Sequence, residues 1–202
     1  MLNHIEKIKD KVAYQAGLLA VTCGIAAMLL VSTELLTRPV IAQRIAEDQD
    51  ALLTEVLDGE SYANKVFEDG HVVTYQGSEF EIFDVKDRQG EVINHVIRGV
   101  EDGYSGAITY LIGVSLQGEI KGVRIISHSE APGLGDKIEL AKSPWVLSFA
   151  HHSVANTPIW GVKKEGGTFD QFSGATITPR SVVKGVHKAM LALQQDQERH
   201  YE

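Results

Sequence analysis

The longest hydrophobic stretch of the chain lies near its N-terminus. Residues 12–33 form a run of 22 residues without a charged side chain. A helix of this length, at 1.5 Å per residue, crosses a bilayer core of about 30 Å. The alternatives are a buried core helix and a cleaved signal peptide, but residues 32–36 match a small-residue cleavage site poorly. The pattern favours an uncleaved transmembrane helix over residues 12–36.

A second helical pattern begins at about residue 37 and predicts a membrane-proximal helix over residues 37–58. Its apolar positions recur on one helical face, and they are Ile41, Ile45, Leu52 and Val56. The acidic cluster at residues 47–50 is interpreted as a solvated face of this helix. Residues 59–70 show no regular pattern and are expected to be an irregular connection.

The middle of the chain alternates between hydrophobic and polar positions, which is typical of strands. Two tight connections, residues 87–90 and residues 117–118, join these extended runs into pairs. The pattern therefore predicts an antiparallel sheet. Its predicted strands are residues 79–85, 91–100, 107–116 and 119–127.

Helical periodicity returns after the strands. Residues 136–150 are expected to be helical, with apolar positions at Ile138, Leu140, Trp145 and Phe149. A C-terminal helix is expected to be capped by Thr178, with Pro179 in its first turn. Its buried face is predicted to be Val182, Val186, Ala189 and Leu193.

These elements predict an α+β fold, an antiparallel sheet with flanking helices preceded by one transmembrane helix. The expected organisation has four parts. They are residues 1–11 as a cytoplasmic N-terminus, 12–36 as the transmembrane helix, 37–58 as the membrane-proximal helix, and 59–202 as a periplasmic domain.

The charged residues indicate which partners the chain can have and on which side of the membrane each end lies. The chain has 27 acidic and 19 basic residues, a net charge of −8, so nucleic acid is an unexpected partner. The single cysteine, Cys23, lies inside the predicted span and provides neither a disulfide nor a four-cysteine cluster site. Three lysines precede the span and two arginines follow it closely, which favours a cytoplasmic N-terminus.

The most informative segment is residues 170–176, Asp-Gln-Phe-Ser-Gly-Ala-Thr, just before the C-terminal helix. A hydroxyl that acts as the acceptor in a transferase needs small neighbours, and Gly174 and Ala175 provide them beside Thr176. The N-terminus of the following helix would then lie near a phosphate attached to this hydroxyl. A plain Ser/Gly turn before a capped helix is the alternative.

This segment resembles the motif recognised by flavin transferases of the ApbE type, which move the FMN half of FAD onto the last Thr. Residues 128–139 resemble the second signature loop of the same FMN-binding domain, with Ala131 where that family usually has Thr. Residues 102–108 resemble a third block. Together with the N-terminal anchor, the three blocks are similar to the G subunit of the Rnf (Rsx) electron-transport complex. The C subunit of the sodium-pumping NADH:quinone oxidoreductase ranks second.

The resemblance implies a covalent FMN, bound to Thr176 through a phosphoester, that relays electrons. It implies a complex that couples electron flow between NADH and ferredoxin to ion movement across the bacterial inner membrane, with subunits A, B, C, D and E as partners. A stand-alone flavoprotein reductase and a flavin-free scaffold remain alternatives. The expected cofactor-binding residues are Thr176, Asp170, Ser173, Gly174, Ala175, Thr178, Tyr104, Glu130, Pro132, Gly133 and Leu134.

Other constellations are weaker. His128, His151 and His152 lack a carboxylate at a familiar metal-ligand spacing, so no metal site is expected. Gly133 and Gly135 lack the third glycine of a dinucleotide-binding loop. Ser173 is not part of a nucleophile elbow. No catalytic residue is therefore expected in this chain.

Overall fold

A computed structural model describes residues 12–200, and the predicted N-terminal segment 1–11 lies outside them. The chain divides into two units, Met1–Asp50 and Ala51–Glu202. Each unit is described on its own below.

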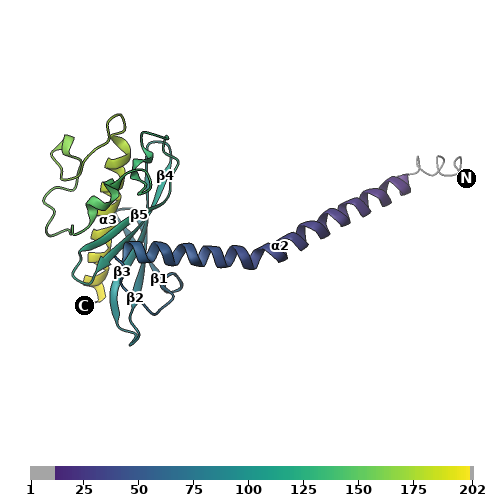
Figure 1. The fold of residues 1–202 in the computed structure, drawn as a ribbon, viewed down its shortest axis with the longest axis horizontal. Helices are drawn as coiled ribbons and strands as arrows, with labels where there is room; N and C mark the ends of the chain where they lie inside the picture. Colours follow the sequence, from purple (N-terminus) through teal and green to yellow (C-terminus); the bar gives the residue numbers. More distant parts are fainter. Residues whose placement is uncertain (1–11, 201–202) are drawn as a thin grey trace, which may run out of the picture. The chain divides into compact units, whose positions relative to one another are not determined.

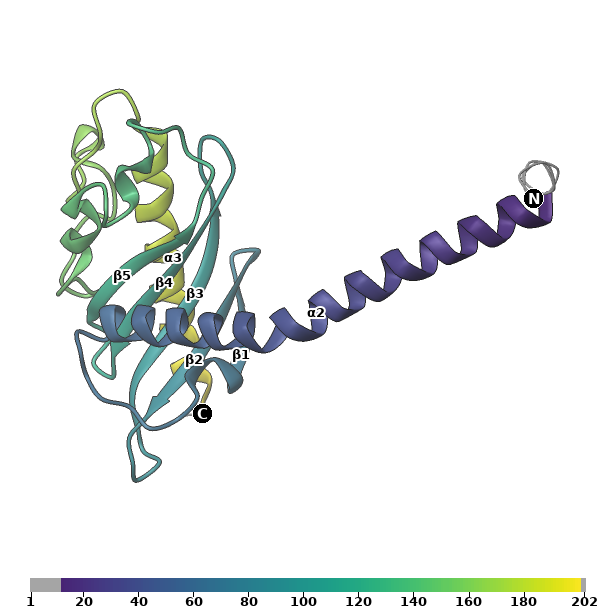
Figure 2. The same ribbon diagram turned by 45° about the vertical axis from the view of Figure 1, so that its right-hand side comes forward.

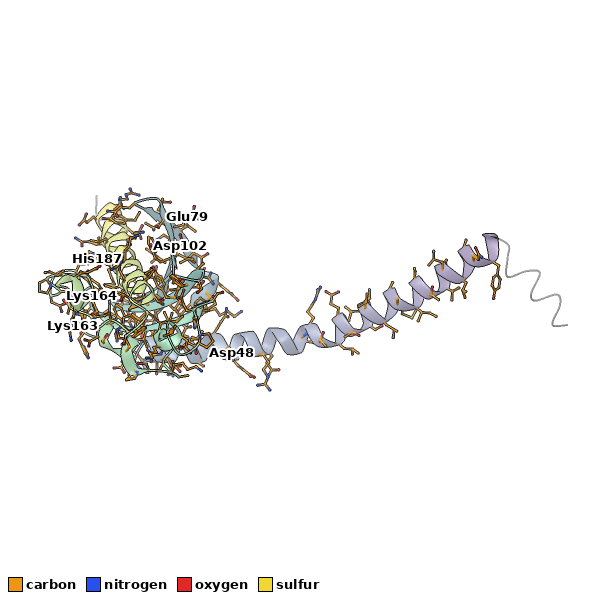
Figure 3. The ribbon with its side chains drawn as sticks, turned by 90° about the horizontal axis from the view of Figure 1, so that it is seen from above. Asp48, Glu79, Asp102, Lys163, Lys164 and His187 are labelled. Atoms are coloured by element: carbon orange, nitrogen blue, oxygen red, sulfur yellow. The ribbon has the colours of Figure 1, made fainter. Side chains whose placement is uncertain are left out.

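The described part of the first unit, residues 12–50, is helical. Helix α2 (Val12–Val56) is continuous through the two segments that the sequence predicted as separate helices, and Pro39 lies inside it. Residues Tyr14–Pro39 have a mean hydropathy of 2.0 and are long and apolar enough to cross a membrane. The described side chains of that segment are exposed, and Figure 3 shows side chains projecting from both edges of the helix. The side chains of Ile41 and Ile45 lie outside the described part.

The second unit is built on a five-stranded antiparallel meander in the order β1-β2-β3-β4-β5 (Figure 1). The sequence predicted four of these strands but missed β1, which pairs with β2 through the Gln76–Gly77 turn. The expected antiparallel sheet is confirmed. Its strands are β1 (Gly70–Tyr75), β2 (Ser78–Lys86), β3 (Val92–Asp102), β4 (Ala107–Ser115) and β5 (Ile120–Ser127).

One face of the sheet packs against helix α3 (Ile177–His200), and Figure 2 shows this helix behind the strands. The apolar side chains of α3 recur in the core at the spacing the sequence predicted. Alternate strand residues point into this core, as the two-residue period of a strand requires. Core members from the strands include Phe80, Ile82, Ile97, Ile108, Tyr110, Ile112 and Ile120, and those from α3 include Val182, Val183, Val186, Ala189, Met190 and Leu193.

The opposite face packs against the last turns of α2. Leu53, Val56 and Leu57 join a second buried cluster with residues of β2, β3 and β4. The helix comes this close because Gly113 and Gly122, which face each other across β4 and β5, have no side chains. A Cβ on Gly122 would lie 3.1 Å from the Glu55 carbonyl oxygen, and one on Gly113 would meet the Val56 carbonyl more closely still.

Residues 136–150 do not form the helix that the sequence predicted. They form two 3₁₀ helices, η2 (Asp136–Ile138) and η3 (Pro144–Phe149). Ser143, which precedes Pro144, is extended (φ −159°, ψ 145°), as expected of a residue before proline. Its side chain accepts a hydrogen bond from the Trp145 N–H, so the proline and its cap start a new helix there. A further short helix is η4 (Lys163–Glu165).

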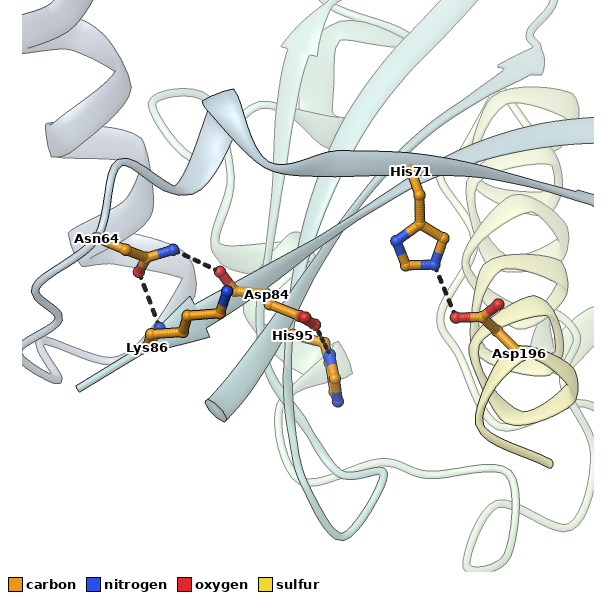
Figure 4. A network of polar contacts seen from close by, with 6 residues as sticks. All are labelled: Asn64, His71, Asp84, Lys86, His95 and Asp196. Atoms are coloured by element: carbon orange, nitrogen blue, oxygen red, sulfur yellow. Dashed lines mark hydrogen bonds and ion pairs between the residues drawn. The ribbon is translucent and has the colours of Figure 1, made fainter. Parts of the chain in front are cut away.

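The connection between α2 and β1 contains η1 (Val66–Glu68) and is pinned to the sheet by Asn64 (Figure 4). The Asn64 side chain donates to the Asp84 carbonyl and accepts from the Lys86 N–H, both at 2.8 Å. Asp84 also bonds His95 at 3.0 Å, and this hydrogen bond lowers the pKa of the Asp84 carboxyl. The expected irregular connection is therefore held in place by side-chain hydrogen bonds.

Candidate functional site

The segment with the acceptor hydroxyl leads directly into α3. Arg180 N donates to the Thr176 carbonyl at 3.3 Å, which makes Thr176 the N-cap residue of the helix. The sequence predicted that Thr178 would be the cap, and this was wrong by two residues. Thr178 lies inside the first turn, 1% exposed, and its hydroxyl is used elsewhere.

A tight turn presents Thr176. Ala175 N donates to the Phe172 carbonyl at 3.3 Å, which closes the turn. Gly174 has φ +84°, a conformation that favours glycine. Ser173 and Gly174 are exposed, whereas Thr176 is half-buried. The hydroxyl-bearing loop is therefore accessible, as the small residues in its sequence predicted.

Glu130 ties three loops together beside Thr176. Its Oε1 accepts hydrogen bonds from Tyr104 N at 2.8 Å and Ser105 N at 3.0 Å. Its Oε2 accepts from the Thr178 hydroxyl at 2.5 Å. The carboxylate is only 6% exposed. One side chain thus joins the β3–β4 loop, the loop after β5 and the first turn of α3.

The backbone around Glu130 is itself fixed. Glu130 N donates to His128 Nδ1 at 3.0 Å, and His128 Nε2 lies 2.6 Å from Glu139 Oε1. Because Nδ1 accepts a hydrogen bond here, the N–H lies on Nε2, which donates a hydrogen bond to Glu139 Oε1. Gly133 N donates to Asp136 Oδ1 at 2.8 Å. The signature loop over residues 128–139 is therefore held by its own side chains.

These three loops enclose a pocket of about 260 Å³ with Thr176 in its wall. Its rim carries exposed apolar side chains, with Tyr104 71% exposed, Leu134 46% and Ile177 44%. The lining residues are Tyr104, Glu130, Ala131, Leu134, Gly135, Gly174, Ala175, Thr176, Ile177 and Thr178.

The structure brings most, but not all, of the predicted residues into this pocket. Asp170, Ser173, Pro132 and Gly133 are not among the lining residues. The Asp170 carboxylate instead pairs with Lys163 Nζ at 2.8 Å. For these four residues the cofactor-binding role stays a prediction. They do not line the pocket, but they belong to the loops that form it.

Sequence reasoning missed two glycines that shape the pocket. A Cβ on Gly135 would lie 2.8 Å from Glu130 Oε2 and 3.0 Å from Thr178 Oγ1, and a Cβ on Gly103 would collide with Glu130 Oε1. Both glycines leave room for the carboxylate. The glycine-rich composition of the two loops was the available signal, but only the fold shows what each glycine faces.

Trp145 and Phe172 lie in the core behind the loop rather than in the pocket wall. Their rings make an edge contact with centroids 5.1 Å apart, and Trp145 Nε1 donates to the Asp170 carbonyl at 2.7 Å. Trp145 therefore fixes the backbone that leads to the turn.

Among residues 12–200, no group of three or more His, Cys, Asp or Glu side chains is arranged to hold a metal ion.

Comparison with known proteins gives a consistent result. The FMN-binding domain family matches residues 103–191. The G subunit of an ion-translocating oxidoreductase complex from Stutzerimonas stutzeri is 39% identical over 189 residues, covering 92% of this chain and 82% of the relative. The corresponding protein from Escherichia coli (strain K12) is 41% identical over 164 residues, covering 79% and 80%. A crystal structure of Shewanella oneidensis NqrC is 23% identical, its match covers 64% of each chain, and its TM-score is 0.41.

The family match places residues 103–191, which contain the pocket, in the class of FMN-binding domains. The chain belongs to the family of G subunits of ion-translocating oxidoreductase complexes. This confirms the predicted resemblance to the G subunit and the predicted class of electron-transfer subunit. The α+β fold of an FMN-binding domain, preceded by one candidate membrane helix, is confirmed as well. The family supports FMN as the cofactor, and the apolar helix supports association with a membrane.

Proposed function

We propose that Thr176 carries FMN through a phosphoester and that this flavin relays electrons within a membrane oxidoreductase complex. The observation that carries the proposal is the position of the Thr176 hydroxyl, in a tight turn, at the wall of a pocket in an FMN-binding domain. The residues present fit the cofactor. Apolar side chains line the rim for a flat ring, and the start of α3 lies next to the attachment point for a phosphate.

Each part of the pocket has a separate role in this proposal. The N–H groups of Ile177 and Thr178 have no acceptor within α3 and are available to phosphate oxygens, whereas Pro179 has no N–H. Tyr104 and Leu134 offer an aromatic and an aliphatic surface for a ring. FMN supplies one-electron and two-electron chemistry when bound. The phosphoester retains the cofactor in a compartment where free FMN is not replenished.

The wider assignment follows the family. We infer that the complex couples electron flow between NADH and ferredoxin to ion movement, with subunits A, B, C, D and E as partners. A flavin transferase of the ApbE type attaches the FMN. The second unit faces the periplasm. Co-purification with integral subunits distinguishes this role from a stand-alone reductase, which needs none, and absorbance of the purified chain distinguishes it from a flavin-free scaffold.

The attachment is tested by flavin fluorescence after denaturing electrophoresis. Wild-type protein should fluoresce, because a phosphoester survives unfolding, and Thr176→Val should be dark. Thr176→Ser should keep a fraction, since it retains a hydroxyl. Thr168→Val is the matched control, because its hydroxyl donates to the Ile159 carbonyl away from the pocket, and it should fluoresce as wild type. Fluorescence in Thr176→Val would place the attachment at another residue.

A further inference from the structure

Glu130 is a buried carboxylate in the wall of the pocket. It is 6% exposed, and within the described residues no Lys, Arg or His side chain forms an ion pair with it. Its hydrogen-bond donors are two backbone N–H groups and one hydroxyl, all neutral. Buried charges in proteins are normally paired with an opposite charge, so this arrangement needs an explanation.

The surroundings suit the ionised form of this carboxylate. An ionised carboxylate only accepts hydrogen bonds, and each of the three contacts donates one to it. Gly103 and Gly135 leave the space that the two oxygens occupy. The side chain is held from three directions, which fixes the charge at one place in the pocket wall.

This charge shares a pocket with the attachment point. Glu130 and Thr176 both line the same cavity of about 260 Å³. Glu130 Oε2 lies 2.5 Å from the hydroxyl of Thr178, two residues beyond Thr176. A ring held in this cavity would lie within the electrostatic field of the carboxylate.

We propose that Glu130 is a fixed negative charge that lowers the reduction potential of the flavin on Thr176. The proposal rests on the proposed function. At neutral pH the oxidised flavin takes up two electrons and one proton, so it gains one negative charge. A neighbouring negative charge disfavours that gain and stabilises the oxidised form. Glu130 thereby makes the attached flavin a stronger reductant.

Glu130→Gln isolates the charge from the geometry. The glutamine oxygen can accept from Tyr104 N and Ser105 N, and its amide can donate to the Thr178 hydroxyl, so the three loops stay joined. Asp136→Asn is the matched control. Asp136 is a second buried carboxylate of the same loop, 7% exposed, and it accepts from Gly133 N but does not line the pocket.

The experiment measures the midpoint potential of the full-length, flavin-loaded chain in detergent by spectroelectrochemical titration. At an effective dielectric constant of about 20, unit charges about 10 Å apart alter an equilibrium constant about tenfold. Glu130→Gln should therefore raise the potential by about 30 mV, the tenfold value for a two-electron couple. Asp136→Asn should shift it much less.

An unchanged potential in Glu130→Gln, or an equal rise in Asp136→Asn, would overturn the inference. So would a Glu130→Gln chain that accepts no flavin while Asp136→Asn accepts it, because Glu130 would then serve attachment rather than the potential. Wild-type protein without flavin on Thr176 is a different outcome, since that result contradicts the proposed function itself. The loaded fraction, read from absorbance, separates these cases.

Discussion

At the scale of single residues, Gly135 decides whether Glu130 and Thr178 can meet. A Cβ there would lie 2.9 Å from Glu130 Cβ and 3.0 Å from Thr178 Oγ1, closer than side chains pack. We expect Gly135→Ala to destabilise the second unit by about 1–3 kcal/mol and to reduce flavin attachment. Thermal unfolding and in-gel fluorescence measure the two effects.

Gly106→Ala is the control for this substitution. Its Cβ would lie 3.5 Å from the nearest atom, on Ser129, which is an ordinary contact. It should therefore leave both the unfolding temperature and the flavin content near wild type. If both variants lost unfolding temperature and flavin content equally, any alanine in these loops would be harmful. That result would contradict the specific role of Gly135.

The sequence was most informative where neighbours along the chain carry the chemistry. Thr176 and its small neighbours are visible as a short motif, and the structure places that motif in a tight turn at a pocket. Glu130 was an expected cofactor-binding residue, but the contacts by which it joins the loops were not predictable, because its partners Ser105 and Thr178 are 25 and 48 residues away in the sequence. Thr178 was predicted to be a cap from local propensity, but its side chain is taken by this long-range contact.

At the scale of elements, two glycines allow α2 to end on the sheet. We expect Gly113→Ala to be more destabilising than Gly122→Ala. The first Cβ would overlap the Val56 carbonyl, whereas the second would lie 3.1 Å from its nearest atom. Overpacking of this kind costs about 1–3 kcal/mol or more. Denaturant unfolding of both variants gives the order, and the reverse order would contradict the packing described for residues 51–57.

A second prediction at this scale concerns pH. His187 of α3 (Figure 3) stacks on Trp160, with ring centroids 5.0 Å apart and planes 2° apart. Burial lowers the pKa of His187, and burial together with the charge of His151 lowers the pKa of His152. These two histidines therefore bind protons more readily in the unfolded chain than in the folded one. Their contribution to the free energy of unfolding is fully present above about pH 6.5, the unfolded value, and is lost as the pH falls below it.

Thermal unfolding from pH 5 to pH 8 checks this expectation. His187→Phe retains an aromatic ring against Trp160 but does not titrate. It should therefore show a weaker loss of unfolding temperature at acid pH than wild type. An identical pH profile in the two proteins would exclude His187 as a source of the dependence.

Helices and strands could be predicted from the sequence where the local pattern of apolar, proline and turn residues determines them. The β1 strand was missed although its Gln76–Gly77 turn repeats the residue pair of the recognised Gln117–Gly118 turn. Residues 136–150 carry helical periodicity, but Pro144 and the Ser143 cap divide them. The continuity of α2 through Pro39 was not expected, since proline usually ends or kinks a helix.

At the scale of the whole molecule, the proposed topology makes a direct prediction. Lys7, Lys9 and Lys11 precede the apolar segment, which favours a cytoplasmic N-terminus and a periplasmic second unit. Protease added to spheroplasts should degrade the chain beyond Thr33, while an epitope at the N-terminus stays protected until the cells are lysed. Protection of residues 51–202 in intact spheroplasts would reverse the topology.

The central claim is that Thr176 bears the flavin. Tryptic cleavage after Lys164 and Arg180 releases residues 165–180, which contain the hydroxyls of Thr168, Ser173, Thr176 and Thr178. Fragmentation of this peptide from the wild-type, membrane-extracted protein by mass spectrometry locates the modification. We expect an FMN phosphoester on Thr176 alone. An unmodified peptide, or a flavin on any of the other three hydroxyls, would contradict the claim.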